Sequence, residues 1–246
     1  MAEMGLRMGT GHPTDSGGEE AVSDVGTAAG ADVSHTQKIC LTCVEVLGVD
    51  GAAVAVMGGT EAREMVYATD AIIQQLDELQ FTLGEGPCID AFRDRKQVEE
   101  PDLSSVEAMR RWPGFAHEAT LAGAGAVFAF PLQAGGIRFG VLECYRQHAG
   151  ALGDQEMTSA LPILKSAVRT VLDDLAGHDS LATTPQNPEP LFGRREVHQA
   201  TGMVAVQLGV SISDALSRLR AAAFARNRPI IDVAREVIDG QPPPRP

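Results

Sequence analysis

The side chains with the clearest capacity for chemistry are the arginines near the C-terminus. Arg194 and Arg195 are adjacent, Arg220 follows, and Arg226 and Arg228 form a closely spaced pair. A guanidinium stays charged and presents a planar fork of N–H donors, so it can bind a phosphate or stack on an unpaired base. The cluster therefore indicates an anion-binding surface, although any single arginine can also be an ordinary solvated charge.

The charge of the chain is divided very unevenly. The 246 residues carry a formal net charge of −13. From residue 193 onward, eight arginines and five acidic residues give +3, so residues 1–192 carry −16. A nucleic acid would be repelled by the acidic part and tolerated only by the C-terminal part, which suggests two tasks on one chain.

A second group of candidate residues is the Cys-x-x-Cys pair Cys40 and Cys43, whose spacing suits a redox site or half of a metal site. The pair lies in an apolar-periodic stretch with Ile39 and Leu47, and no second pair with ligand spacing follows. A four-ligand zinc site is therefore not expected. Free cysteines in such stretches are usually buried, so we expect packed thiols and no metal.

Catalytic machinery is not expected. The six histidines are scattered, and the sequence has no Gly-rich nucleotide-binding loop, no zinc-protease motif and no recognisable Ser/His/Asp set. It also has no apolar run of about 18 residues that would cross a membrane, and no apolar signal-peptide core near its start. We expect a non-enzymatic, cytoplasmic protein that does not associate with membranes, and no cofactor can be assigned.

The N-terminal patterning predicts an α+β domain. Apolar periodicity favours helices at 34–47, 70–79, 89–93, 105–121 (interrupted near Pro113) and 154–175, and strands at 52–57, 63–69, 97–99, 126–132 and 137–145. Glycine pairs after the first and fourth of these strands predict two hairpins, so the sheet should be largely antiparallel, with flanking helices.

This region resembles a GAF domain over about residues 36–176. The resemblance rests on Gly51 before an apolar strand, on the run Phe81-x-Leu83-Gly84-Glu85-Gly86-Pro87-Cys88, and on the late Gly-hinged hairpin. It implies a sensor of signals or small molecules with a pocket on one face of the sheet. We expect an unidentified small-molecule ligand at most, because the sequence has no haem-attachment motif and no evident phosphate anchor.

Four residues are candidates for lining such a pocket: Tyr67, Gln80, Glu85 and Cys88. A plainer interpretation makes Tyr67 a strand residue and Cys88 a core residue, with the glycines of the loop forming the turn. Both interpretations remain open on the sequence alone.

The last helix of this domain carries a heptad-like seam. Its apolar residues are spaced 4, 3, 4, 3, 4 and comprise Met157, Leu161, Leu164, Val168, Val171 and Leu175. Such a seam is typical of a two-helix contact and predicts a homodimer. A helix that packs on its own sheet needs an apolar stripe as well, so the two alternatives are balanced.

Composition also predicts the domain boundaries. Residues 1–33 lack the apolar surface to fold and are expected to be a disordered tail. The first domain spans 34–176, a linker rich in proline, serine, threonine and asparagine spans 177–190, a three-helix domain spans 191–240, and 241–246 form a short tail. In the third domain, Gly209 should end the first helix, Ser211 should cap the second, and Pro229 should occupy the first position of the third.

The three-helix segment resembles the ANTAR domain of transcription antitermination regulators. The matching stretches are Gln199-Ala200-Thr201-Gly202-Met203-Val204, Gln207-Leu208-Gly209-Val210-Ser211, Ala215-Leu216-x-x-Leu219-Arg220-x-x-Ala223 and Val233-Ala234. A GAF domain followed by an ANTAR domain is a familiar actinobacterial arrangement. Thr201 departs from the pattern, because many members carry lysine there. Threonine in place of that lysine removes a positive charge from the expected RNA surface.

The resemblance implies a regulator that binds hairpins in leader transcripts and stabilises an antiterminator. The residues it assigns to RNA binding are Arg194, Arg195, Gln199, Ala200, Thr201, Gly202, Arg220, Arg226 and Arg228. Small residues would admit the RNA backbone or a loop base close to the first helix, and the arginines would contact phosphates or stack. Gly202 can alternatively serve close helix packing.

Two other functions compete with RNA binding. Three small helices can form a DNA-binding helix-turn-helix, but the third helix exposes Asp232, Arg235, Glu236 and Asp239, which is net acidic and would repel DNA. The chain can also be a sensor or scaffold that acts only through protein contacts.

Overall fold

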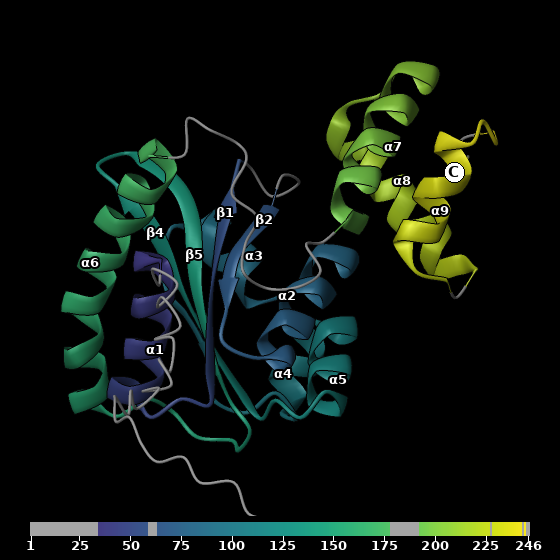
Figure 1. The fold of residues 1–246 in the computed structure, drawn as a ribbon. Helices are drawn as coiled ribbons and strands as arrows, with labels where there is room; N and C mark the ends of the chain where they lie inside the picture. The colour runs from purple at the N-terminus through teal and green to yellow at the C-terminus, as the bar shows by residue number, and fades with distance from the viewer. Residues whose placement is uncertain (1–33, 59–62, 178–191, 227, 243, 245–246) are drawn as a thin grey trace, which may run out of the picture. The chain divides into compact units, whose positions relative to one another are not determined.

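The N-terminal domain is built on a five-stranded antiparallel sheet in the order β2-β1-β5-β4-β3 (Figure 1). The computed structural model describes residues 34–58, 63–177, 192–226, 228–242 and 244. The strands are β1 (Gly51–Met57), β2 (Arg63–Ala68), β3 (Val98–Glu100), β4 (Ala126–Ala134) and β5 (Ile137–Arg146). Both expected hairpins are confirmed, since β1 pairs with β2 and β4 with β5, each antiparallel.

Several sequence-based expectations lie outside the described residues. They are the tail at 1–33, nearly all of the linker at 177–190, and part of the tail at 241–246. Residues 59–62, which include the second glycine of the predicted Gly58-Gly59 turn, are also outside this part of the chain.

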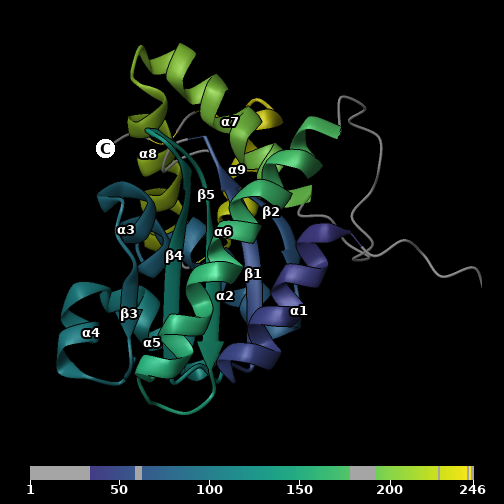
Figure 2. The same ribbon diagram turned by 90° about the vertical axis from the view of Figure 1, so that its left-hand side faces the viewer.

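Two helices cover one face of the sheet. They are α1 (His35–Leu47) and α6 (Asp154–Gly177), which lie side by side (Figure 2). Ser34 caps α1, because its hydroxyl accepts from the backbone N–H of Gln37 at 3.1 Å. Cys40 and Cys43 point from α1 into the apolar layer beneath it and are fully buried.

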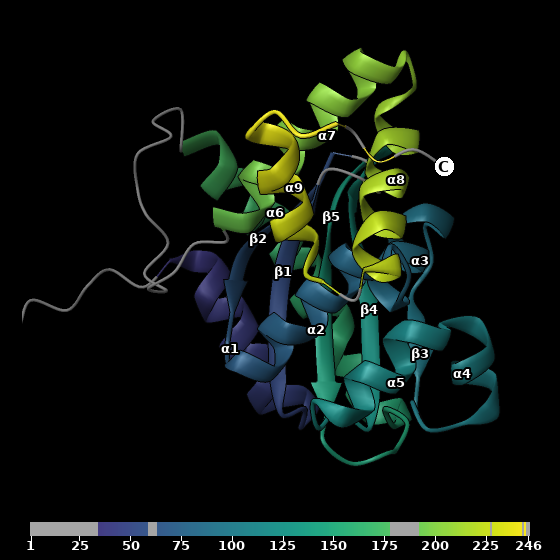
Figure 3. The same ribbon diagram turned by 90° about the vertical axis from the view of Figure 1, so that its right-hand side faces the viewer.

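The opposite face is covered by α2 (Ala71–Leu83), α3 (Pro87–Asp94), α4 (Val106–Arg111) and α5 (Pro113–Leu121) (Figure 3). Asp70 caps α2 by accepting from the backbone N–H groups of Ile72 and Ile73 at 2.8 and 3.0 Å. The break predicted near Pro113 separates α4 from α5.

Helix α2 continues one turn past its expected end at Leu79. The reason is that Gln80 and Phe81 are both buried, at 0% and 1% exposure, and therefore gain from staying in the packed helix. The helix ends at Gly84, which adopts φ 73° and donates its N–H to the carbonyl of Gln80 at 2.9 Å. This extra turn carries Gln80, which contacts Glu143, and Phe81, which packs with residues of the C-terminal helices.

The seam of α6 packs mainly on its own domain. Met157, Leu164 and Val168 are partly buried against α1 and the sheet, and Val171 is 1% exposed. These positions favour the plainer alternative of a helix packed on its sheet. Leu161, at 55% exposure, departs from the seam and faces solvent. The side chain of Leu175 is outside the described part.

The C-terminal domain consists of α7 (Phe192–Leu208), α8 (Ile212–Ala225) and α9 (Ile230–Ile238). Gly209 ends the first helix with φ 64°, and the Ser211 hydroxyl accepts from the N–H of Asp214 at 3.0 Å, both as expected. Pro229 lies one position earlier than predicted, because its extended ψ of 141° makes it the residue before the helix. The α+β domain followed by three helices confirms the predicted fold class.

The first testable prediction concerns the two thiols of α1. Replacing Cys40 and Cys43 together by alanine should lower the free energy of unfolding by an amount on the order of 1 kcal/mol per site, because each sulfur leaves a gap in a packed layer. Urea denaturation followed by circular dichroism measures the change. The control is Leu41→Ala, on the exposed side of the same helix. A metal ion bound by the purified wild type and lost from the double variant would refute a purely packing role.

Candidate functional site

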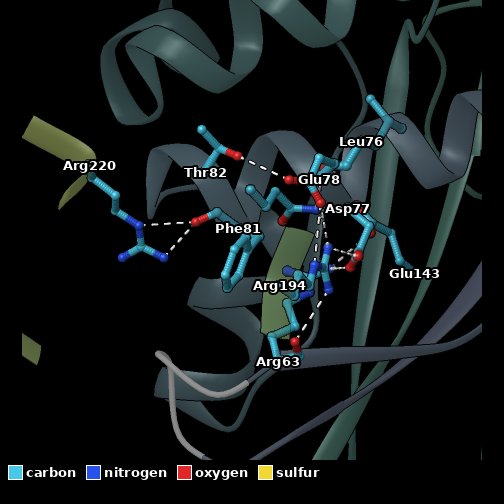
Figure 4. Close-up of polar contacts among 10 residues, drawn as sticks. Arg63, Leu76, Asp77, Glu78, Phe81, Thr82, Glu143, Arg194 and Arg220 are labelled. Atoms are coloured by element: carbon cyan, nitrogen blue, oxygen red, sulfur yellow. Dashed lines mark hydrogen bonds and ion pairs between the residues drawn. The ribbon is translucent and has the colours of Figure 1, made fainter. Parts of the chain in front are cut away.

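Arg194, expected on an RNA-binding surface, is instead buried against α2. Its side chain is 1% exposed and forms an ion pair with Asp77 and another with Glu78 at 3.2 Å (Figure 4). Its Nη1 also donates to the carbonyl of Arg63 at 3.3 Å. Val33–Pro246 form one compact unit, so these contacts join the C-terminal helices to the first domain.

Arg220 contacts the same helix one turn further on. Its Nε and Nη2 both donate to the backbone carbonyl of Phe81, at 3.0 and 2.5 Å (Figure 4). The Phe81 ring lies 4.7 Å from the Arg194 guanidinium and meets the His198 ring edge-on at a centroid distance of 5.7 Å. Burial lowers the pKa of His198, which favours its uncharged form. Two of the arginines assigned to RNA thus hold the last turn of α2.

The outward face of α7 carries a different subset of the predicted residues. Arg195 and Gln199 are exposed, and Gly202 and Val206 follow at helical spacing on the same face. A Cβ atom built on Gly202 would meet nothing within 4 Å, so this glycine does not serve close helix packing. Val206 is 84% exposed. The face is therefore open and lacks a side chain at its centre.

Ala200 and Thr201 point inward from the same helix. Ala200 is 0% exposed and Thr201 is 2% exposed. The Thr201 hydroxyl donates to the carbonyl of Val197 at 2.7 Å. Position 201, which the resemblance placed on the RNA surface, is thus part of the domain interior, and of the Ala-Thr-Gly triplet only Gly202 reaches the surface.

The last two arginines are exposed but already paired. Arg226 Nη1 lies 2.7 Å from Glu236 Oε2, and Arg228 pairs with the other oxygen of the same carboxylate. Hydrogen bonding from Arg228 lowers the pKa of Glu236, so this carboxylate stays charged. A phosphate would compete with Glu236 for these two arginines, whose side chains are 46% and 42% exposed.

Only two of the four pocket candidates come together. The backbone N–H of Cys88 donates to Gln80 Oε1 at 2.7 Å. Glu85 turns away and accepts from the N–H groups of Gly114 and Phe115 at 2.7 and 2.9 Å, at the start of α5. Tyr67 packs with the layer under α1 and α6, on the opposite face of the sheet.

The sequence analysis missed a buried ionic network beside Gln80. Gln80 Nε2 donates to Glu143 Oε1 at 2.7 Å, and Arg63 lies 3.5 Å from Glu143 Oε2 while also pairing with Asp77. All four side chains are at most 2% exposed. A charged residue within a buried run of a strand, as Glu143 is between Leu142 and Cys144 of β5, was the signal that could have revealed it.

The network contains a carboxyl group that titrates near neutrality. Burial raises the pKa of Glu143 to about 7, against the opposing effect of the nearby Arg63 guanidinium. Burial also raises the pKa of the Cys88 thiol well above its ordinary value, which keeps the thiol protonated and unreactive.

Within the described ranges, no three His, Cys, Asp or Glu side chains are grouped so that they could hold a metal ion. In that part of the chain, no helix combines the length and the apolar character needed to span a bilayer.

Comparison with known proteins identifies the C-terminal helices. Residues 189–238 match the ANTAR domain, which confirms the resemblance in that segment. Solved structures similar to the N-terminal part include a domain of a two-component sensor histidine kinase from Sinorhizobium meliloti, at 18% identity and a TM-score of 0.46 over 57% of this chain and 91% of that one. Comparison with curated protein sequences gave no match.

Two further similar structures are described as GAF domains. One belongs to a phosphoenolpyruvate-protein phosphotransferase from Coxiella burnetii, at 14% identity and a TM-score of 0.46 over 60% of this chain and 88% of that one. The other is the GAF-B domain of DevS from Mycobacterium smegmatis, at 19% identity and a TM-score of 0.40 over 57% and 93%.

The second testable prediction follows from Glu143. A carboxyl group with a higher pKa in the folded chain binds more protons when folded, so stability falls as pH rises from its ordinary value of 4.5 to about 7. Glu143→Gln should flatten this part of the pH profile, because an amide does not titrate. Urea denaturation at several pH values gives the two profiles. Exposed Glu118→Gln is the control, and parallel profiles for wild type and Glu143→Gln would contradict the assignment.

Proposed function

We propose that this protein is an RNA-binding regulator of transcription antitermination. Its ANTAR domain binds hairpins in leader transcripts and prevents a terminator from forming, and its N-terminal domain supplies the signal input. The observation that carries this proposal is the ANTAR match at residues 189–238, on a three-helix domain whose first helix has an open, cationic face.

The chemistry of that face suits RNA. Arg195 supplies a charge for a phosphate, and Gln199 supplies an amide that can both donate to and accept from a base edge. Gly202 lies beside them with free space above it, which lets a sugar–phosphate backbone or an unstacked base approach the helix closely. Arg226 and Arg228 extend the surface once a phosphate replaces Glu236 as their partner.

The signal input is assigned to the N-terminal domain. We propose that a small-molecule signal acts on the buried polar group around Gln80 and Cys88, because their hydrogen bonds connect α2 to α3 and to β5. Mass spectrometry of the natively purified protein would identify a retained ligand.

We also propose a homodimer formed through the outward side of α6. Leu161 and Leu172 are 55% and 38% exposed, and Val168 is partly buried between them. Their spacing of seven and four residues aligns them along one side of the helix. We assign the dimer contact to this stripe because most of the apolar seam predicted from the sequence packs within its own domain. Two copies would present two ANTAR domains to paired hairpins.

The third testable prediction concerns RNA recognition. Arg195→Ala should weaken binding to a pool of RNA hairpins with randomised loops by about 1–3 kcal/mol, and should reduce the slope of log affinity against log salt by about one unit. Fluorescence anisotropy at several salt concentrations measures both. The matched control is Arg169→Ala on α6, whose side chain is 87% exposed and far along the sequence from the ANTAR domain.

Three results would count against RNA recognition by this face. They are the absence of any hairpin binding, equal affinity for duplex DNA, and the same loss of affinity in Arg195→Ala and Arg169→Ala.

The fourth testable prediction concerns assembly. Leu161→Asp combined with Leu172→Asp should give a folded monomer, because two carboxylates would be desolvated in the proposed interface. Light scattering gives the mass, and circular dichroism confirms folding. Leu121→Asp, at a 70% exposed site on α5, is the control and should keep the wild-type mass. A wild type that is already monomeric, or a double variant that stays dimeric, would exclude this interface.

A further inference from the structure

We propose that α2 is an internal competitor of RNA: its C-terminal half holds Arg194 and Arg220 in a docked, inactive state, and the protein binds RNA only when the ANTAR domain leaves α2. This inference rests on the proposed function and names how the same surface is regulated.

The docked arginines cannot serve RNA at the same time. The Arg194 side chain is 1% exposed, and Asp77 and Glu78 occupy its Nη2 while Glu78 also accepts from its Nε. Arg220 directs its Nε and Nη2 to one carbonyl oxygen of α2. Because Arg194 is buried, docking on α2 and phosphate binding exclude each other at this residue, and at Arg220 docking occupies two of the five N–H donors that a phosphate could use.

An apolar contact accompanies the ionic one. Phe81 is 1% exposed, and its side chain belongs to the apolar cluster of the ANTAR domain together with Val197 and Leu219. Gly84, which follows the helix, lies so close to Arg220 that a Cβ atom there would come within 2.8 Å of its Nη1. The last turn of α2 and the loop after it therefore present one continuous docking surface.

The competitor resembles the ligand that it displaces. Asp77 and Glu78 place two carboxylates on successive positions of α2, and the Phe81 ring lies 4.7 Å from the Arg194 guanidinium. Anionic oxygens beside a stacked ring are also what an RNA loop offers to an arginine. The strongly acidic N-terminal part thus supplies an intramolecular substitute for RNA.

The same half of α2 is tied to the interior of the sensor domain. Asp77 is shared between Arg194 of the ANTAR domain and Arg63 of β2. Arg63 is in turn shared with Glu143, which accepts from Gln80. A change in the buried network therefore reaches the docked arginine through the Asp77 carboxylate and through the Arg63 carbonyl, and Asp77 is the side chain that positions Arg194 between signal and output.

Glu78 offers the cleanest test of the docked state. Its side chain is 44% exposed, so it can be changed without emptying the core, whereas replacing Asp77 would strip a buried partner from Arg63. Glu78→Lys in the full chain should release Arg194 and tighten binding to the randomised-loop hairpin pool about tenfold. Glu78→Gln should act in the same direction with a smaller effect. Glu118→Lys makes the same charge change at an exposed position of α5 and is the control.

A second measurement needs no RNA. Small-angle X-ray scattering of the free proteins, compared at equal oligomeric mass, should give a larger radius of gyration for Glu78→Lys than for wild type and Glu118→Lys. Circular dichroism confirms that each variant is folded.

The outcomes separate the two claims. If Glu78→Lys and Glu118→Lys bind hairpins equally well, or if the radius of gyration does not increase, the docked state is not inhibitory and the proposed function stands. If the variant expands but neither it nor the wild type binds hairpin RNA, the proposed function fails and the inference fails with it. Tighter binding together with expansion, specific to Glu78, supports the inference.

Discussion

The shared carboxylate of Asp77 is the interaction on which the account of this protein depends. It lies on α2, is 1% exposed, and pairs with Arg63 from the sheet and with Arg194 from the ANTAR domain. A buried carboxylate of this kind is tolerated only while cations surround it. If Arg194 leaves, Asp77 retains Arg63, and Arg194 must find another anion. The cost of undocking is therefore set by what replaces α2, and RNA is a suitable replacement.

The extra turn of α2 makes this arrangement possible. One side of the turn carries Gln80, which holds Glu143 and the loop at Cys88, and the other carries Phe81, which packs among ANTAR residues. Because both side chains lie on one helical turn, α2 links the interior of the first domain to Arg194 and Arg220. The two tasks inferred from the divided charge are thus linked through a few side chains.

Local sequence patterns were sufficient to predict the helices and strands but not the contacts of the candidate site. Alternating and helical periodicity placed the strands and helices, and the caps at Asp70 and Ser211 were found from residue type. The pairing of Arg194 with Asp77 joins residues 117 positions apart, so no local pattern carries it. Arg194, Ala200 and Thr201 look like surface residues in the motif, yet tertiary packing buries all three. Gln199 and Gly202 do lie at the surface of α7, and their role in RNA binding stays a prediction.

The central claim is that RNA and α2 compete for the same arginines, and hydrogen exchange of the full-length protein tests it directly. Hairpin RNA is added to the wild type, and exchange is followed in a peptide covering residues 76–84. The account predicts that these amides exchange faster once RNA is bound, because Phe81 loses its cover and the turn loses its ion pairs with the ANTAR domain. Exchange that stays unchanged or becomes slower in the RNA-bound protein would contradict it.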